Sequence, residues 1–265
     1  GPGATFASTS NKLAHLQALG VNAIELMPVN EFTTGTSWGY NPAYPFAMES
    51  SYGAPDHFKA LVRECHSRGM AVLLDVVHNH WDGADLWQYD GWAPDPQYGG
   101  NYFYSTQFLC CTDWGPRPDY SRPAVRGFIF DSFRMWLDEY RLDGFRWDAP
   151  YHILYAWRTN GTWQFIPEGA SLLQETVQMI GAQYTNKINI AEDMKDLTGF
   201  DSYWNTGFIG AVEPELTSSE DMYRDMFALA AAIDNSADAV ERVIYTESHD
   251  TTGDLNGGAR LPARI

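Results

Sequence analysis

Three carboxylates that could act as acids or nucleophiles follow short apolar runs of the sequence. They are Asp148 after Gly-Phe-Arg-Trp, Glu192 after Ile-Asn-Ile-Ala and Asp250 shortly after Val-Ile-Tyr-Thr. Carboxyl groups that share a pocket perturb each other's pKa, so one can stay protonated as a general acid while another stays ionised as a nucleophile. A single aspartate more often caps a helix or satisfies a loop. Three of them, accompanied by arginine and histidine, favour catalysis.

The elements that would bring these groups together alternate along the chain. Apolar residues at helical spacing predict helices at 13–19, 56–69, 123–140, 171–184 and 223–233. Between them, β-rich apolar runs predict strands at 21–29, 44–48, 70–77, 142–147, 188–191, 200–208 and 243–246. Asp56 is the expected N-cap of the second helix, and Gly69 is its expected end. Such alternation is typical of parallel βα units.

Polar residues at the end of almost every expected strand decide between two α/β folds. An open doubly wound sheet concentrates polar groups at one switch point, whereas a (β/α)8 barrel of the TIM type collects them from many strand ends onto one face. We therefore expect an α/β protein with a TIM (β/α)8 barrel, in one catalytic domain over residues 1–265 with a short inserted loop subdomain at about 81–122. Only about seven of the eight βα units can be placed, so the barrel should be incomplete. Its closure is expected from residues 255–265 with a partner, or from further domains of a longer parent protein.

Charge and composition limit the partners. The chain has 34 acidic and 17 basic residues, a net charge of −17, which repels phosphate backbones and anionic lipid surfaces. No apolar run approaches the roughly 18 residues of a membrane-spanning helix, and no glycine-rich phosphate loop follows a strand. We expect a neutral substrate, no nucleic acid and no membrane. The three cysteines, Cys65, Cys110 and Cys111, are expected to be buried thiols in a reducing, cytoplasmic compartment.

Four ordered segments carry a family resemblance. They read Asp-Val-Val-His-Asn-His at 75–80, Gly-Phe-Arg-Trp-Asp at 144–148, Ala-Glu-Asp at 191–193 and Ser-His-Asp at 248–250. Together they resemble the motifs of the α-amylase family of glycoside hydrolases and transglycosidases. A further segment, Glu-Leu-Met-Pro-Val at 25–29 followed by Ser-Trp-Gly-Tyr-Asn-Pro at 37–42, is similar to the start of the barrel in glycogen branching enzymes.

The resemblance implies roles for the three carboxylates. Asp148 would be the nucleophile that forms a covalent glycosyl-enzyme, Glu192 the general acid and then base, and Asp250 a group that stabilises the transition state. This is double displacement with retention, which needs the first two carboxyls about 5–5.5 Å apart. Arg146 lies two residues before Asp148, on the same face of the strand, and can hold the nucleophile ionised.

Further residues would contact or organise the substrate. The residues that the resemblance implies for substrate binding are Tyr40, His80, Arg146, Trp147, His152 and His249, with Tyr40 as a stacking platform. Asp75 and Asn79 would organise the site. In calcium-dependent relatives the matching asparagine can be a ligand, but no second acidic cluster completes a cage of roughly 6–8 oxygens here. We therefore predict no metal and no cofactor, with calcium unassigned.

The chain departs from the amylase pattern in three places. Many amylases have Ala-x-Lys-His after the nucleophile, where this chain has Ala149, Pro150, Tyr151 and His152, so Tyr151 replaces an acceptor-side lysine. The last motif reads Ser-His-Asp, as in branching enzymes, rather than Asn-His-Asp, and the segment between His80 and Leu142 leaves room for only a short form of the metal-binding insertion of many amylases. The last two features favour branching enzymes. The expected reaction is transfer of a cleaved α-1,4 chain to a 6-hydroxyl of glycogen, starch or a malto-oligosaccharide. The alternatives are a hydrolase of the α-amylase type, which would favour secretion, and a non-catalytic glucan-binding barrel fragment.

The segment 81–114 is rich in aromatic rings, which can stack on sugar faces or simply fold the loop onto the barrel. The rings are Trp81, Trp87, Tyr89, Trp92, Tyr98, Tyr102, Phe103, Tyr104 and Trp114.

Overall fold

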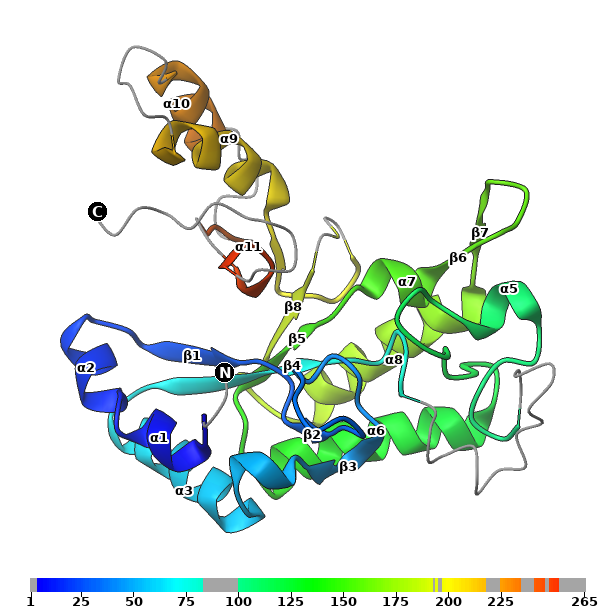
Figure 1. Cartoon of the computed structure of the whole chain (residues 1–265), viewed down its shortest axis with the longest axis horizontal. Helices are drawn as coiled ribbons and strands as arrows, with labels where there is room; N and C mark the ends of the chain where they lie inside the picture. The colour runs from blue at the N-terminus through cyan, green and yellow to red at the C-terminus, as the bar shows by residue number, and fades with distance from the viewer. Residues whose placement is uncertain are drawn as a thin grey trace.

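The computed structural model describes residues 4–82, 100–192, 194, 197–217, 225–234, 241–245 and 248–252. Its central element is a parallel six-stranded sheet with the order β1-β4-β5-β8-β9-β10 (Figure 1). These strands are Ala23–Leu26, Ala71–Val76, Gly144–Trp147, Ile188–Ala191, Ser202–Trp204 and Arg242–Val243. Two small antiparallel ribbons join β2 (Asn30–Glu31) to β3 (Tyr44–Met48) and β6 (Tyr155–Trp157) to β7 (Trp163–Phe165).

Helices follow most strands of the sheet. In chain order they are α1 Phe6–Ser10, α2 Leu13–Ala18, α3 Pro55–Ser67, α5 Gln107–Cys110, α6 Pro123–Asp138, α7 Pro150–Leu154, α8 Pro167–Gln183, α9 Thr206–Thr217, α10 Met226–Asp234 and α11 His249–Thr252, with a 3-10 turn at Ser50–Tyr52. The long helices α3, α6 and α8 each begin with proline, whose fixed φ suits a first helical turn. They lie along one side of the sheet (Figure 1).

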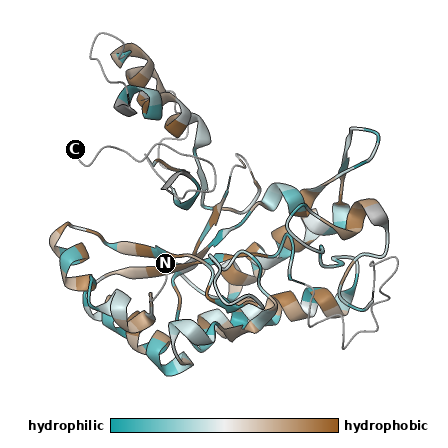
Figure 2. Ribbon diagram, in the orientation of Figure 1, coloured by the Kyte–Doolittle hydropathy of each residue, from teal (hydrophilic) through white to brown (hydrophobic). Residues whose placement is uncertain are grey.

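The core lies between this side of the sheet and the helices. Hydrophobic and hydrophilic stretches alternate along α3 and α6 (Figure 2), and α3 buries Phe58, Leu61 and Val62 against the protein. All four residues of β5 are buried, and so are five of the six in β4. Strands covered on both faces read as continuous apolar runs rather than as alternating ones. For this reason the sequence predicted the central strands correctly.

The strand register places the expected reactive residues at one edge. Asp75 of β4 pairs with Arg146 of β5, and Trp147 of β5 pairs with Ala191 of β8. Asp148 and Glu192 follow directly, and their amide groups still bond to the neighbouring strands. At the other end, a Cβ on Gly144 would collide with the backbone oxygen of Ile188, so glycine permits β5 and β8 to pair.

Within the described residues the barrel is incomplete, as predicted, but its sheet has six strands rather than seven. The expected second strand, 44–48, is formed as β3, yet it pairs antiparallel with β2 and does not enter the parallel sheet, where β1 pairs directly with β4. Pro45 has no amide hydrogen to donate to a central ladder, which suits β3 to a two-stranded ribbon. The expected strand 21–29 is accordingly shorter, because the chain leaves β1 after Leu26 to form β2.

Two local expectations need correction. The helix α3 begins at Pro55 with Ala54 as its N-cap, so Asp56 lies inside the first turn and does not cap it. Cys110 and Cys111 form a disulfide with each other, so only Cys65 is a free, buried thiol. Thiol pairing depends on backbone geometry at the two residues, which sequence spacing does not show.

The described part of the inserted segment, 100–122, is tied to the barrel by buried rings and one buried arginine. Phe103 and Tyr104 are buried, as is Trp81 at its start, so these three rings fold the loop onto the protein. Arg117, with 1% exposure, donates from Nε to the carbonyl of His152 at 3.0 Å. Trp87, Tyr89, Trp92 and Tyr98 lie outside the described residues, and the limits of this subdomain stay a prediction.

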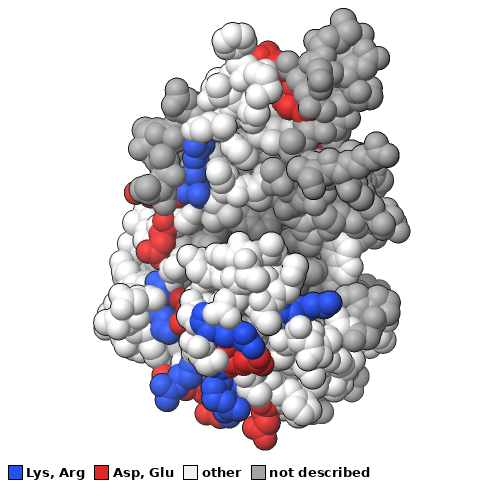
Figure 3. Space-filling view, turned by 90° about the vertical axis from the view of Figure 1, so that its left-hand side faces the viewer, with Lys and Arg blue, Asp and Glu red and all other residues white. Residues whose placement is uncertain are grey.

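On the face in Figure 3, basic side chains lie beside acidic ones. Exposed ion pairs of this kind include Arg134 with Asp131 at 2.7 Å and Arg68 with Glu64 at 3.0 Å. In the described part of the chain, no helix is long and apolar enough to cross a membrane. The cytoplasmic location and the lack of a nucleic-acid partner stay predictions.

Buried His78 should make stability depend on pH. Burial lowers the pKa of His78 to about 3, and its Nδ1 accepts a bond from Trp81 Nε1 at 3.4 Å, so the ring is neutral in the fold. Between about pH 3 and 6.5 the unfolded chain binds one more proton at this site, so stability is lost as pH falls below 6.5, by about 1.4 kcal/mol per unit. We expect His78→Gln to flatten this slope in urea denaturation. The exposed His15, changed to Gln, is the control and should leave the slope unchanged; an equal slope in both variants would contradict the prediction.

Candidate active site

One buried guanidinium lies at the centre of the polar strand ends. Arg146 is fully buried, and its Nη1 donates to both oxygens of Asp75 at 2.8 Å and to Oδ1 of Asp148 at 2.9 Å. Its Nη2 lies 2.9 Å from Oε2 of Glu192. Burial lowers the pKa of Arg146, but the three carboxylates together raise it above its ordinary value. Three neighbouring strands therefore meet at a single permanent cation.

Asp148 is held at both carboxyl oxygens. Arg146 binds Oδ1, and the Asn79 side-chain amide donates to Oδ2 at 2.7 Å and to the Asp148 carbonyl at 2.9 Å. The side chain of Asp148 is 13% exposed, so it still reaches the pocket. Hydrogen bonds at both oxygens fix the orientation of a carboxylate. This arrangement suits a nucleophile that must keep one position.

Glu192 is oriented by a backbone group that sequence reasoning did not identify. The amide of Ala149 donates to Glu192 Oε2 at 2.7 Å. Ala149 has φ 40° and ψ 56°, a left-handed conformation that costs a non-glycine residue energy. Such strain is common at functional sites, and here it turns the amide toward the second carboxylate. The contact between the Ala149 amide and Glu192 follows from the backbone conformation, and no residue type in the sequence indicates it.

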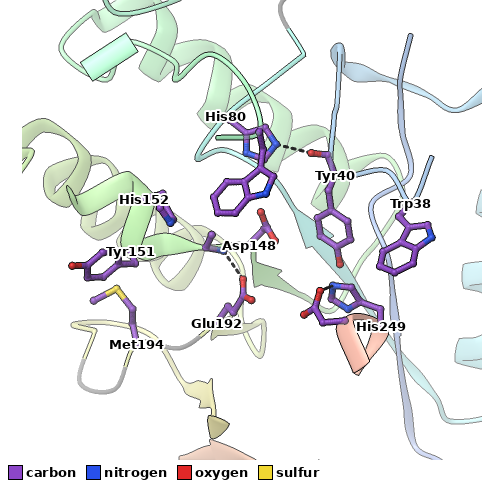
Figure 4. Close-up of a pocket in the computed structure, with 12 residues that line it drawn as sticks. Trp38, Tyr40, His80, Asp148, Tyr151, His152, Glu192, Met194 and His249 are labelled. Atoms are coloured by element: carbon purple, nitrogen blue, oxygen red, sulfur yellow. Dashed lines mark hydrogen bonds and ion pairs between the residues drawn. The ribbon is translucent and has the colours of Figure 1, made fainter. Parts of the chain in front are cut away.

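Tyr40 and His249 form a stacked pair on the other side of Asp148 (Figure 4). The Tyr40 hydroxyl donates to Asp75 Oδ2 at 2.5 Å, and burial together with Asp75 raises the pKa of Tyr40, which keeps it protonated. Its ring lies 4.9 Å from that of His249, at 17°. Burial lowers the pKa of His249, while Asp250, 3.3 Å from its Nε2, opposes this. Asp250 itself is 54% exposed and lies at the rim.

His80 uses both ring nitrogens within the protein. Nδ1 bonds Asn79 Oδ1, and Nε2 bonds the Tyr40 carbonyl at 2.6 Å. Burial lowers the pKa of His80, although the Tyr40 carbonyl and Asp148 oppose this effect. His80 therefore joins the Asp148 side of the site to the Tyr40 side. Its contact with a sugar stays a prediction.

These groups line one cavity of about 860 Å³ (Figure 4). Of the residues predicted for the site, seven line it: Tyr40, His80, Asp148, His152, Glu192, His249 and Asp250. Asp75, Asn79 and Arg146 lie beneath and are buried, where they position the others. The lining residues that the sequence-based site set omitted are Trp38, Trp114, Ala149, Tyr151 and Met194. Both tryptophans were within reach of sequence reasoning, because Trp114 lies in the aromatic-rich segment 81–114 and Trp38 lies in the motif at 37–42.

Trp147 is a correction to the predicted substrate contacts. It is fully buried and does not line the cavity. Its ring stacks on Phe133 at 4.7 Å, and its Nε1 donates to Asn189 Oδ1 at 3.3 Å. Alternation along β5 puts Trp147 on the face opposite to Arg146 and Asp148. It therefore belongs to the core.

Among the described residues, no group of three or more His, Cys, Asp or Glu side chains is arranged to hold a metal ion.

Removing the central cation should destabilise the fold strongly. Arg146→Gln would leave buried Asp75 without its charge partner, since burial raises the pKa of Asp75 and Arg146 opposes this. Breaking a buried pair in this way costs about 3–5 kcal/mol. The control is Arg134→Gln, which breaks the exposed pair with Asp131 and should cost less than about 1 kcal/mol. Urea denaturation measures both; equal losses would contradict the central role of Arg146.

Comparison with known proteins gives the family. The family model described as the α-amylase catalytic domain matches residues 5–108. The malto-oligosyltrehalose trehalohydrolase of Saccharolobus solfataricus is 29% identical over 97% of this chain and 48% of its own length. The 1,4-α-glucan branching enzyme of Picrophilus torridus is 34% identical over 74% of this chain and 30% of its own length. The chain thus spans less than half the length of these two curated relatives.

A solved structure has the same fold. The α-amylase from Anoxybacillus superposes with a TM-score of 0.74, covering 94% of this chain and 56% of that chain at 20% identity, a likeness that speaks for the fold alone. The motifs occur in order, the strands that carry them meet at one cavity, and the sequence relatives are members of one family; this chain belongs to the α-amylase family of glycoside hydrolases and transglycosidases.

Proposed function

We propose that the protein is a retaining α-1,4-glucan transglycosidase that makes branches. The observation that carries the proposal is the shared guanidinium of Arg146, which contacts both Asp148 and Glu192 at the wall of one cavity. Retaining glycosidases need two carboxyl groups on opposite sides of one scissile bond, with different protonation states. Asp148 and Glu192 both contact Arg146, and each has one further donor, the Asn79 amide for Asp148 and the Ala149 backbone amide for Glu192.

In the first step, Asp148 attacks the anomeric carbon of a glucosyl residue. The C–O glycosidic bond breaks, and Glu192 gives its proton to the leaving oxygen. Arg146 and Asn79 hold the attacking carboxylate in place. The product is a glycosyl ester of Asp148 and a shortened glucan with a free hydroxyl.

In the second step, Glu192, now ionised, takes the proton of a 6-hydroxyl on an acceptor chain. The acceptor oxygen attacks the same anomeric carbon, and Asp148 leaves as a carboxylate. Tyr40 and His249 provide a stacked aromatic wall for the glucosyl residue that is transferred. Asp250 at the rim would bind its hydroxyls while positive charge develops on the ring.

Two features favour a sugar acceptor over water. The cavity wall includes Trp114, Tyr151 and Met194. At position 151 the tyrosine ring presents more apolar surface than the lysine found there in many amylases would. An apolar wall that a sugar can cover excludes water from the glycosyl-enzyme. The Ser-His-Asp sequence at 248–250, which resembles that of branching enzymes, points the same way.

A hydrolase is the second candidate. The relative that aligns with 97% of this chain is named as a malto-oligosyltrehalose trehalohydrolase. The same two carboxylates would serve, with water in place of the acceptor sugar. Malto-oligosyltrehalose therefore belongs in the substrate panel, with trehalose as the diagnostic product.

Substitution of the two carboxylates should separate their roles. Asp148→Asn and Glu192→Gln should each lower turnover of amylose by at least about a thousandfold. With α-maltosyl fluoride, whose leaving group needs little protonation, Glu192→Gln should retain fluoride release while Asp148→Asn should not. Circular dichroism checks that both variants are folded. Full activity in either variant on amylose would contradict the assignment.

The products made by the unmodified protein from amylose should distinguish the two candidates. Proton NMR can follow new reducing ends and α-1,6 linkages in the same sample. New branch points with few reducing ends are expected. Reducing ends without branches would establish hydrolysis instead, and the absence of both, with no fluoride release, would contradict catalysis by this chain.

A further inference from the structure

A hairpin beside the cavity exposes its largest side chains to solvent. The strands β6 and β7 pair antiparallel, with Tyr155 opposite Phe165 and Trp157 opposite Trp163. Side chains alternate along a strand, so these four rings lie on one side of the hairpin, which we call the aromatic face. Trp157, Trp163 and Phe165 are 54%, 42% and 49% exposed. Exposed apolar surface that continues from ring to ring is typical of a binding surface.

The hairpin exposes its large aromatic side chains and buries a small one, whereas packing into a core would bury the large ones. Its small residue, Ala156, points to the other side and is fully buried. The base of the hairpin is fixed: buried Arg117 donates to the carbonyls of His152 at 3.0 Å and Tyr155 at 3.4 Å. Arg158 also stacks over the Phe108 ring at 5.0 Å. The exposed rings thus stand on a rigid support, which lowers the entropy lost when a ligand binds.

The aromatic face is continuous with the catalytic cavity. The Trp163 ring lies 4.9 Å from Tyr151 and 5.7 Å from His152, both of which line the cavity. From Trp163 the next ring, Trp157, is 5.0 Å away. His152 also contacts Trp114 at 5.0 Å on the cavity wall. Each of these ring-to-ring distances is similar to the length of one glucosyl residue.

The chemistry identifies which part of the substrate would lie there. Figure 4 shows Tyr151, His152 and Met194 on one side of Asp148, with Tyr40 and His249 on the other. Glu192 protonates the leaving oxygen and later deprotonates the acceptor, so both the leaving chain and the acceptor chain occupy the side of Glu192. That side leads through Tyr151 to the aromatic face.

We propose that the aromatic face of the β6–β7 hairpin binds an α-1,4-glucan, at the part of the bound chain that extends out of the cavity on the acceptor side. This inference rests on the proposed glucan substrate. Flat sugar faces stack on exposed tryptophan rings. A single-stranded nucleic acid would also stack on such rings, but the net charge of −17 repels it, whereas a neutral glucan is not repelled.

The test is calorimetric titration of the full chain with maltoheptaose and with maltose. Both titrations use the Glu192→Gln background, which prevents turnover. Replacing Trp157 and Trp163 together by Ala should raise the Kd for maltoheptaose about tenfold, because two stacking contacts are lost. The Kd for maltose, which is too short to span both the cavity and the hairpin, should change by less than about twofold.

Three control variants make the result specific. Gln164→Ala alters the opposite side of β7, and Phe227→Ala removes an 89% exposed ring on α10; neither should change the Kd for maltoheptaose. Replacing both tryptophans by Tyr keeps aromatic rings on the face and should restore much of the affinity. An unchanged Kd for maltoheptaose in the double Ala variant, folded by circular dichroism, would overturn the proposal, and a protein partner would then be the better occupant.

Fluoride release from α-maltosyl fluoride separates this inference from the proposed function. With Glu192 restored, the wild-type chain is assayed for the first equivalent of fluoride, which reports formation of the glycosyl-enzyme and needs no acceptor chain. If the wild-type chain releases no fluoride but still binds maltoheptaose through the two tryptophans, the proposed catalysis fails and the binding surface stands. If it releases fluoride and the tryptophans do not affect binding, the binding surface fails and the catalysis stands.

Discussion

The site depends on one buried charge, the guanidinium of Arg146. Its two terminal nitrogens contact carboxylates from three successive strands of the parallel sheet, Asp75 at β4, Asp148 after β5 and Glu192 after β8. A cation is needed at this point, because Asp75 is buried and its burial opposes ionisation, which the charge of Arg146 offsets. The arginine therefore makes the convergence of three strand ends possible. The register that places Asp75 opposite Arg146 is equally necessary.

The connection after β5 links the catalytic centre to the surface of the protein. Asp148 ends the strand, and the left-handed Ala149 turns the chain so that its amide meets Glu192. The helix α7 then presents Tyr151 and His152 to the cavity, and the hairpin β6–β7 follows at once. A single continuous segment thus carries Asp148, the amide that orients Glu192 and one wall of the cavity. In the proposed mechanism these are the nucleophile, the group that positions the acid, and the acceptor side.

The three carboxylates that line the cavity, Asp148, Glu192 and Asp250, differ in how firmly they are held. Asp148 and Glu192 are 13% and 17% exposed and are fixed by neighbours, whereas Asp250 is 54% exposed, with His249 as its nearby ring. The first two groups must stay aligned with one bond through both chemical steps, which requires preorganisation. A group at the rim that binds hydroxyls can adjust as the substrate enters. The firmness of each contact matches the role proposed for it.

The sequence by itself determined the central strands, the long helices and most of the residues that meet at the cavity. It could do so because strands buried on both faces read as apolar runs and because parallel strands bring the residues after them to one edge. Tertiary structure decided what depends on contacts distant in the sequence or on backbone angles. It paired β3 with β2 outside the parallel sheet, joined Cys110 to Cys111, and placed the Ala149 amide on Glu192. It also buried Trp147 and exposed Trp157 and Trp163, although all three are the same residue type. Residue type sets how much surface a ring can bury, but only the packing of neighbouring elements decides whether that surface meets the core, the solvent or a substrate.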